Sequence, residues 1–227
     1  MKFSMCSDKP SGSRMIISPS RETLDKLVCH QVHNLFLLDE DEREKLVGLI
    51  PGVLGKVEYC FGHSSNKYYR KDGVVFFDVY HSGQYCIFLY FLSRSLFLES
   101  SGNTDLAAKV YCLNKALNGL DVFYEIAMPE IFHLDHPVGS VLGRATYGNN
   151  FTFAQLCTVG NNKGIFPEIG ENVQMLSGSK IIGKCKIGDN VIISANAYVK
   201  DTDIPANSLV FGSSPNLVIK PRKVLPE

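Results

Sequence analysis

The sequence has no excess of either charge and no long apolar run. Its 227 residues carry 23 Lys and Arg against 23 Asp and Glu, so the formal net charge is zero. A chain without a basic field is not drawn onto a polynucleotide or an anionic membrane, so no nucleic-acid partner is expected. The longest apolar run, 85–92, is much shorter than the roughly 20 residues that cross a bilayer. No transmembrane segment is therefore expected.

Signals for secretion and for metal binding are also missing. The N-terminal stretch has no apolar core after its first lysine, so it does not read as a secretory signal. The seven cysteines are odd in number, widely scattered and never in a C-x-x-C spacing, which argues against a metal site or a disulfide framework. We therefore expect buried, reduced thiols, no metal and a cytoplasmic location.

The composition is that of an ordinary globular protein, with 45% hydrophobic and 20% charged residues. Residues 1–19 are rich in Ser, Pro, Lys and Gly, and we expect a mobile leader there. Apolar residues at three- and four-residue steps then predict a mainly helical domain over 20–119. Its expected helices cover 20–35, with Ser20 as N-cap, 42–50, ended by Pro51-Gly52, 53–61, 85–98 and 104–118, closed by Gly119. The type of the segment 74–80 stays open.

After Asp121 the apolar residues recur at every sixth position. The series, with one ten-residue step after its fourth member, is Val141, Tyr147, Phe153, Val159, Ile169, Met175, Ile181, Ile187, Ile193 and Val199. A hexapeptide repeat is typical of a parallel β-helix, in which three hexads close one triangular coil, so about three coils are expected. The longer step predicts a loop that bulges out around 161–167. A β-sandwich of short strands is the weaker alternative.

Three features of the segment 121–215 resemble the left-handed β-helix acyltransferases, and the serine O-acetyltransferases in particular. They are the hexads, the L-D-H-P-x-G stretch that ends at Gly139, and the closing F-G-S-S-P that ends at Pro215. The resemblance implies an α+β fold class, with a mainly α-helical N-terminal domain followed by a left-handed parallel β-helix with an extruded loop. The β-helix is expected over 120–216 and a C-terminal tail over 217–227.

The resemblance also implies a catalytic pair. In the family pattern the His of the L-D-H motif pairs with an Asp fifteen residues upstream, and here Asp121 stands fifteen residues before His136. His136 would take the proton from an acceptor hydroxyl, and Asp121 would orient its imidazole. Asp135 would line the acceptor pocket. The acetyl group would pass directly from acetyl-CoA to the acceptor, without a covalent enzyme intermediate.

A binding site for acetyl-CoA is implied in the groove between adjacent β-helices of a homotrimer, or of a dimer of trimers. The positions that match the family's pantetheine-contacting turns hold small residues, as close backbone approach requires. They are Gly160, Ser177, Gly178 and Ala195. Lys200, Lys220 and Arg222 are candidates for the nucleotide phosphates, although each could equally be a solvated surface charge.

The extruded loop departs from the family pattern. The family has Arg-His-Pro there, whose Arg and His contact the substrate amino acid, whereas this chain has Ile165, Phe166 and Pro167. A free amino acid loses a charge-assisted pair without the guanidinium, whereas an apolar wall suits the face of a sugar ring. The sequence therefore favours O-acetylation of a sugar or surface-polysaccharide precursor. The alternatives are a serine O-acetyltransferase of cysteine biosynthesis, N-acetylation of an amino sugar, and a non-catalytic scaffold that binds coenzyme A.

The other histidines are interpreted as structural or exposed. They are His30, His33, His63 and His133. His81 lies in a turn just before the 85–98 helix, and a helix-start turn explains it more simply than a place in the acceptor site. The segment 68–73 combines aromatic and basic residues that could stack on a base or sugar, but a β-turn at 71–73 explains it more simply.

Overall fold

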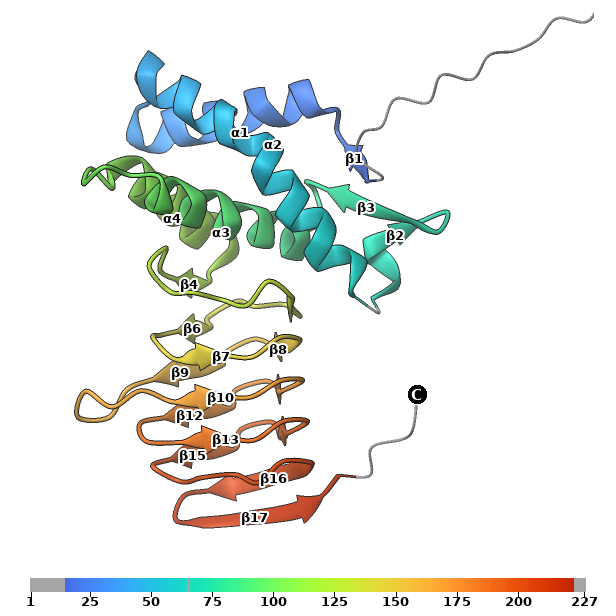
Figure 1. Cartoon of the computed structure of the whole chain (residues 1–227), viewed down its shortest axis with the longest axis vertical. Coiled ribbons are helices and arrows are strands. Elements are labelled where there is room, and N and C mark those ends of the chain that lie inside the picture. Colours follow the sequence, from blue (N-terminus) through green and yellow to red (C-terminus); the bar gives the residue numbers. More distant parts are fainter. Residues whose placement is uncertain (1–14, 65, 223–227) are drawn as a thin grey trace, which may run out of the picture.

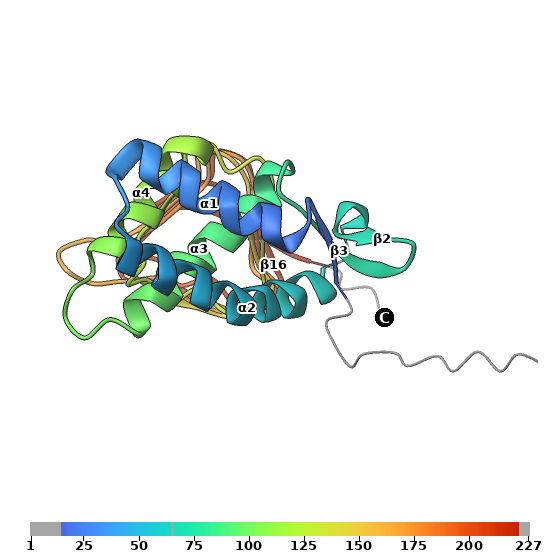
Figure 2. The same ribbon diagram turned by 90° about the horizontal axis from the view of Figure 1, so that it is seen from above.

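A computed structural model describes residues 15–64 and 66–222, which form a helical layer above a β-helix (Figure 1). Viewed from above, the helices lie over one end of the coil (Figure 2). The helical layer contains α1 (Arg21–Phe36), α2 (Glu40–Gly62), the 3-10 helix η1 (Lys67–Tyr69), α3 (Ser82–Leu98) and α4 (Asp105–Asn118). None of the helices in the described part of the chain is both long enough and apolar enough to span a membrane.

A small sheet flanks these helices. It has the order β1-β3-β2 and consists of β1 (Ile16–Ser18), β2 (Arg70–Lys71) and β3 (Val74–Asp78). Strand β1 pairs in parallel with β3, so residues 16–18 of the predicted mobile leader are held in a sheet. Residues 1–14 of that leader lie outside the described residues. The division of the chain into domains stays a prediction, because the helical layer and the coil share one continuous cluster of buried apolar residues.

Helix α2 corrects the prediction of two helices separated by Pro51-Gly52. The helix continues through Pro51. A proline inside a helix leaves the carbonyl four residues earlier without its usual donor, and here that carbonyl belongs to Val47. Arg21 of α1 supplies a replacement, because its Nη2 donates to the Val47 oxygen at 3.5 Å. The tertiary packing of α1 on α2 therefore offsets part of the local cost of the proline.

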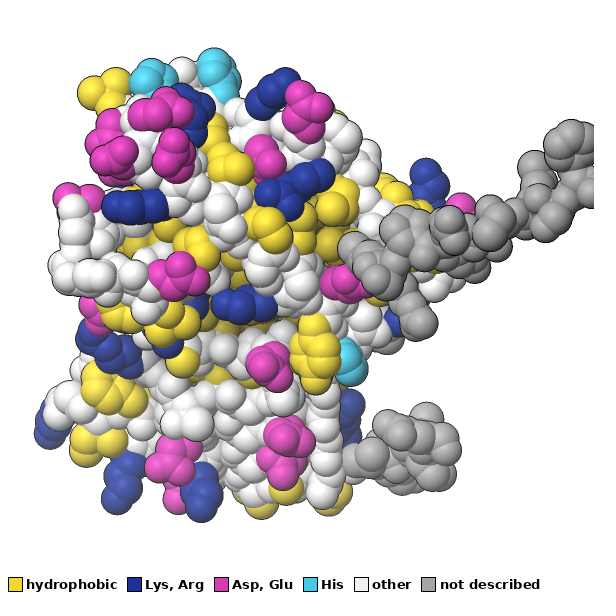
Figure 3. Space-filling model, turned by 45° about the horizontal axis from the view of Figure 1, so that its top comes forward, with side chains coloured by type: hydrophobic (Ala, Val, Ile, Leu, Met, Phe, Trp, Pro, Cys, Tyr) yellow, Lys and Arg dark blue, Asp and Glu magenta, His cyan; other side chains and the backbone are white. Residues whose placement is uncertain are grey.

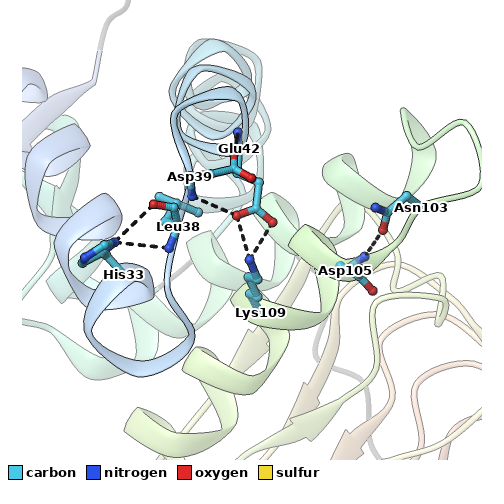
Figure 4. Close-up of polar contacts among 7 residues, drawn as sticks. All are labelled: His33, Leu38, Asp39, Glu42, Asn103, Asp105 and Lys109. Carbon is cyan, nitrogen blue, oxygen red and sulfur yellow. Dashed lines mark hydrogen bonds and ion pairs between the residues drawn. The ribbon is translucent and has the colours of Figure 1, made fainter.

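The N-terminus of α2 is tied to α4 (Figure 4). The Glu42 N–H donates to Asp39 Oδ1 at 2.8 Å, and the Asp39 N–H donates back to Glu42 Oε2 at 3.2 Å, which forms a capping box. Lys109 Nζ lies 2.6 and 2.7 Å from the two oxygens of the same Glu42 carboxylate. Both side chains are about one-fifth exposed, so this ion pair is shielded from water more than a surface pair is. It holds α4 against α2.

The coil has three flat faces of parallel strands, as the predicted left-handed β-helix requires. The first face stacks β5 (Phe132–Leu134), β8 (Phe151–Phe153), β11 (Gln174–Met175), β14 (Ile192–Ile193) and β16 (Ser208–Ser213). The second face stacks β4 (Asp121–Val122), β6 (Val141–Leu142), β9 (Thr158–Gly160), β12 (Lys180–Ile182) and β15 (Tyr198–Lys200). The third face stacks β7 (Thr146–Tyr147), β10 (Glu168–Ile169) and β13 (Lys186–Ile187).

The coil has about five turns, where the hexads predicted about three. The outer turns of the coil do not have the eighteen residues of a regular central turn. The six-residue pattern of apolar residues therefore does not extend into them. For example, Leu142 pairs with Val159, seventeen residues later, and Leu134 pairs with Phe153, nineteen residues later. The same offset corrects one member of the series. Val141 is 44% exposed and Leu142 takes its place inside, whereas the other nine predicted residues are buried.

Three corners join the faces. The first corner comprises 136–139, 155–157, 177–179 and 195–197, and joins the first face to the second. The second corner joins the second face to the third, and the predicted loop at 161–167 leaves the coil there (Figure 1). The third corner, with 148–150, 170–172, 188–190 and 206–207, joins the third face back to the first.

The lower end of the coil is closed by a hairpin. Strand β17 (Asn216–Pro221) pairs antiparallel with β16, so most of the described part of the predicted tail 217–227 is a strand. Residues 223–227 lie outside the described residues. On the face of the molecule shown in Figure 3, acidic and basic side chains are interspersed, in line with the zero net charge.

Candidate active site

The L-D-H-P-x-G stretch forms the first turn of the first corner, directly after β5. Leu134 points into the core, and the side chains of Asp135 and His136 are 76% and 85% exposed. The backbone of the turn is held at both ends, because the Asp135 N–H donates to the Phe153 carbonyl at 2.9 Å and the Val138 N–H donates to the His136 carbonyl at 2.8 Å. His136 itself has a left-handed backbone, with φ 49°. The motif therefore projects a carboxylate and an imidazole outwards from a fixed turn.

A cavity of about 330 Å³ opens beside these two side chains. This volume lies in the range that small-molecule sites occupy. The helical layer supplies one wall of it and the turn after β5 supplies the other. The residues that line it are Asn66, Tyr68, Tyr80, His81, Ser82, Gly83, Leu134, Asp135 and His136.

The start of α3 shapes the wall opposite the turn. His81 is the N-cap of α3, and its Nδ1 accepts the Gln84 N–H at 3.3 Å. In the neutral ring Nε2 therefore carries the proton and is free to face a ligand. Gly83 packs on the turn, because a β-carbon there would approach Leu134 Cδ1 to 3.0 Å. The prediction of a helix-start turn at His81 is confirmed, and the same residue also lines the cavity.

The predicted catalytic pair is not in contact within this chain. Among the hydrogen bonds and ion pairs of residues 15–64 and 66–222, none joins Asp121 to His136. The ion-pair partner of His136 is Asp135, whose Oδ1 lies 3.5 Å from His136 Nε2. That separation is long for a strong hydrogen bond, so the imidazole is not locked in one orientation. The roles of His136 and Asp121 stay predictions.

Asp121 instead binds two side chains of α4. Its Oδ1 accepts from the Tyr111 hydroxyl at 2.6 Å, and its Oδ2 accepts from Lys115 Nζ at 2.6 Å. Partial burial acts to raise the pKa of Asp121, but the hydrogen bonds from Lys115 and Tyr111 and the charge of Lys115 outweigh it and lower that pKa. Burial, and then the neighbouring Asp121, raise the pKa of Tyr111 to about 12. Asp121 is therefore ionised and fully engaged in this chain.

The predicted apolar loop residues lie away from this cavity within one chain. Ile165 and Phe166 are 49% and 41% exposed on the loop at the second corner, whereas His136 lies on the first corner. The loop is closed at its base by Asn162, whose N–H and carbonyl pair with Ile165 at 3.1 and 3.0 Å. Neither loop residue is among those that line the cavity. Their role in binding an acceptor stays a prediction.

Three of the four small residues predicted to contact coenzyme A lie together. Ser177, Gly178 and Ala195 stack on the first corner, below the turn that carries His136. Gly178 is buried, with φ 73°, and a β-carbon there would come within 2.4 Å of Asn196 Oδ1. Gly160 belongs to the second corner instead, since its carbonyl accepts from the Gly183 N–H at 2.9 Å. One protomer therefore presents these positions on two different edges.

The three basic residues predicted for the nucleotide phosphates are not gathered in one place. Lys200 ends β15 at the second corner, and its N–H donates to Ser214 Oγ at 2.9 Å. Lys220 is exposed on β17 with its ammonium 5.7 Å from the ring centre of Phe211. Arg222 lies at the third corner, where its N–H donates to the Asn207 carbonyl at 2.8 Å. A shared phosphate site for them within one chain is not formed.

Four cavity residues were not predicted from the sequence, namely Asn66, Tyr80, Ser82 and Gly83, and Tyr68 was left undecided. Asn66 and Tyr80 carried no recognised motif, and Tyr68 was noted only as part of an aromatic and basic stretch. That stretch contains η1, β2 and a turn at Asp72-Gly73, so the predicted turn is also present. The signal that was available is Tyr80 next to His81, which gains meaning only when α3 packs on the L-D-H turn.

Known proteins that are similar to this chain in sequence and those that are similar in fold belong to the same group of transferases. Residues 166–201 match the family model described as bacterial transferase hexapeptide (six repeats). A serine acetyltransferase of Staphylococcus epidermidis is 34% identical over 111 residues, which are 47% of this chain and 52% of that protein. The crystal structure of Neisseria gonorrhoeae serine acetyltransferase has a TM-score of 0.70 at 20% identity, and covers 88% of this chain and 79% of that one.

This chain resembles the serine acetyltransferases. A third comparison is with the Brucella abortus serine acetyltransferase in complex with coenzyme A, which has a TM-score of 0.65 at 18% identity and covers 92% of this chain and 85% of that one. The predicted resemblance and fold class are thus confirmed. The chain spans about half the length of the Staphylococcus relative, so the activity of that serine acetyltransferase is taken up below as a proposal.

Proposed function

We propose that this protein is an acetyl-CoA-dependent O-acetyltransferase with His136 as its general base. The supporting observation is that the L-D-H turn presents Asp135 and His136 to a cavity of about 330 Å³. The same corner of the coil carries Ser177, Gly178 and Ala195, the small residues that suit close approach of a thioester chain. The relatives are named serine acetyltransferases, and the Brucella relative binds coenzyme A.

The chemistry follows from an imidazole beside an open cavity. His136 accepts the proton of the acceptor hydroxyl while that oxygen attacks the thioester carbonyl of acetyl-CoA. The resulting tetrahedral oxyanion expels the sulfur of coenzyme A, and the imidazolium returns its proton to the leaving thiolate. The products are the O-acetyl ester and free coenzyme A. An imidazole suits both steps because it accepts and releases a proton near neutral pH.

Serine is the acceptor that the comparisons favour over the sugar favoured by the sequence. Both the curated relative and the solved structures described above carry serine acetyltransferase in their names. In this chain Asp135 is the anionic group of the cavity, and a carboxylate there suits the ammonium group of an amino acid. The serine carboxylate would need a partner from outside the described cavity, because neither Arg nor Lys lines it.

A sugar hydroxyl is a second candidate, and the aromatic wall of the cavity favours it. Tyr68 and Tyr80 are 59% and 79% exposed where they line the cavity, and the ring centre of His81 lies 6.2 Å from that of Tyr68. Exposed aromatic faces pack against the C–H groups of a sugar ring. The exposed Ile165 and Phe166 would add to such a wall only if the loop of another protomer reached the cavity.

The geometry also favours a trimer as the active form. In one chain His136 is largely exposed, and the loop and the first corner lie on different edges of the coil. In the proposed trimer the second corner of one protomer would meet the first corner of the next, which would cover the imidazole and close a groove for acetyl-CoA. We place the protein in the cytoplasm, where its thiols stay reduced. The described cysteines are all free.

The acceptor is tested by measuring the free thiol that the protein releases from acetyl-CoA. L-Serine is compared with sugars, amino sugars and nucleotide sugars at equal concentration, and each product is identified by mass. Ester formation on serine is the expected result. Transfer to a carbohydrate alone would replace serine with the second candidate. Thiol release with none of these acceptors, together with tight binding of coenzyme A, would contradict both and indicate a non-catalytic scaffold.

A further inference from the structure

A second polar cavity, of about 310 Å³, lies on the first face of the coil beneath the helical layer. All seven of the described residues that line it are polar, and none of the seven is acidic. Three of them can carry positive charge, namely His63, His133 and Arg222. The other four are neutral hydrogen-bonding side chains, namely Asn150, Thr152, Asn172 and Gln174.

Three distant parts of the chain build this cavity. His63 caps the C-terminus of α2, His133 comes from β5, and Arg222 follows β17. Arg222 is held in place by two contacts with the third corner. Its N–H donates to the Asn207 carbonyl at 2.8 Å, and its Nη1 donates to the Asn190 carbonyl at 3.3 Å. The terminal hairpin therefore brings a guanidinium back onto the face of the coil.

Several of the donors around the cavity are not used by the protein, whereas His63 Nδ1 lies 2.7 Å from the Tyr59 carbonyl and Asn172 Nδ2 donates to Asn190 Oδ1 at 3.1 Å. Among the described residues the Thr152 hydroxyl and the Gln174 amide make no hydrogen bond, and Arg222 commits one of its side-chain N–H groups. His133 Nδ1 is sealed from solvent and has no partner in the described part of the chain. A buried bare acceptor costs less than a buried unpaired N–H, so His133 carries its proton on Nε2.

Among the described residues, no carboxylate lines this cavity to balance the positive charge of Arg222. Burial, and then the charge of nearby His63, lower the pKa of His133, so its ring is neutral unless an anion enters. The Asp189 carboxylate at the third corner does not line the cavity, and it accepts the Glu171 N–H at 2.8 Å. A cation would find no carboxylate here. A tetrahedral oxyanion would find a guanidinium, two imidazoles and several neutral donors.

We propose that this cavity binds a phosphate group, held by Arg222 and His133 and completed by His63, Thr152 and Gln174. The ligand is either inorganic phosphate or the phosphomonoester end of a larger molecule. None of these residues lines the proposed catalytic cavity, so this site is separate from the acceptor site, although Arg222 is also one of the sequence candidates for the phosphates of coenzyme A. His133 nevertheless lies only two positions before Asp135 on the same strand end, so a bound phosphate is a close neighbour of that cavity.

Isothermal titration calorimetry on the full chain tests the site with two probes, inorganic phosphate and glycerol 3-phosphate, at constant ionic strength. Arg222→Gln removes the guanidinium but keeps an amide, and it is expected to weaken binding by roughly tenfold or more. His133→Phe keeps the aromatic contact with Tyr69 and should weaken binding as well. Lys186→Gln removes an exposed charge from the third face of the same coil and is expected to leave the dissociation constant unchanged.

Folding of each variant is checked by its thermal melt, and the C2–H NMR signals of His63 and His133 should shift when phosphate is added to the parent protein. Tighter binding of glycerol 3-phosphate identifies a phosphorylated ligand, whereas tighter binding of inorganic phosphate identifies the free anion. The proposal is overturned if about 10 mM phosphate gives neither heat nor shift, since that concentration would saturate a millimolar site. Equal weakening by Lys186→Gln would also overturn it.

Discussion

The buried side-chain amide of Gln84 donates to the carbonyl of Tyr68 at 2.9 Å. Its oxygen accepts the Asp78 N–H at 2.6 Å, and Gln84 is fully buried. One amide at the start of α3 therefore fixes both η1 and the end of β3, the segments that place Tyr68 and Tyr80 around the candidate active site. The wall of that cavity depends on a residue that does not itself line it.

Replacing Gln84 by Met is expected to destabilise the fold by about 2 kcal/mol, because it leaves the partly buried Asp78 N–H and Tyr68 carbonyl without their partner. Urea unfolding measures this change. Gln155→Met is the matched control, since Gln155 is half-buried at the first corner and should cost less than about 0.5 kcal/mol. Equal effects of the two substitutions would mean that the amide of Gln84 does not hold the wall.

Substitutions of Gly148 at the third corner and of Gly52 in α2 are expected to change stability in opposite directions. A β-carbon at Gly148 would lie 2.5 Å from the carbonyl carbon of Gly170, whereas one at Gly52 in α2 would meet nothing within 4 Å. Gly148→Ala is therefore expected to lower stability by about 2 kcal/mol through overpacking against backbone. Gly52→Ala should raise it by about 0.5 to 1 kcal/mol, because alanine favours the helix. Thermal melts compare them, and a stabilising Gly148→Ala would contradict the stacking of the coil.

The Asp121 carboxylate predicts a pH-dependent contribution to stability. Its pKa is lower in the folded chain than in the unfolded chain, so the stabilisation is present above the unfolded value near 4 and is lost as the pH falls through the folded value. Asp121→Asn should cost about 1 kcal/mol at pH 7, and the gap to the parent should close as the pH drops well below 4.

A double-mutant cycle with Lys115→Met identifies the partner of this carboxylate. Because Lys115 Nζ lies 2.6 Å from Asp121 Oδ2, the two losses of stability should not add. Additive losses, or a gap between Asp121→Asn and the parent that stays constant from pH 7 to strong acid, would show that the ion pair contributes nothing. In that case Asp121 would be free to serve His136.

The sequence predicts the centre of the coil and not its ends, for a geometric reason. Residues such as Ile169 and Ile187 keep a strict eighteen-residue turn, so their spacing is visible as hexads. Near the helical layer the turns take seventeen to twenty residues, and Val141 falls in the series although Leu142 is the buried residue. Likewise, Pro51 ends a helix by local rules, and only the donor from Arg21 in another helix lets α2 continue.

The candidate site, too, was predicted only in part from the sequence. Asp135 and His136 were predicted from a motif that is contiguous in sequence, and the structure places both at a cavity. Tyr80 and Asn66 come from segments whose position depends on how α3 packs against the coil, which no local pattern records. Lys115, which lies beside Asp121 at the end of α4, gave no sequence signal of a competing ion pair either.

His136 carries the proposed mechanism, and one assay tests its role as the general base. Coenzyme A release from acetyl-CoA with L-serine as acceptor is compared between the parent protein and His136→Asn, with coenzyme A binding measured on both. We expect kcat to fall by roughly 10² to 10⁴, the usual contribution of a general base, while coenzyme A binds as before. An unchanged kcat in His136→Asn would contradict the proposed mechanism.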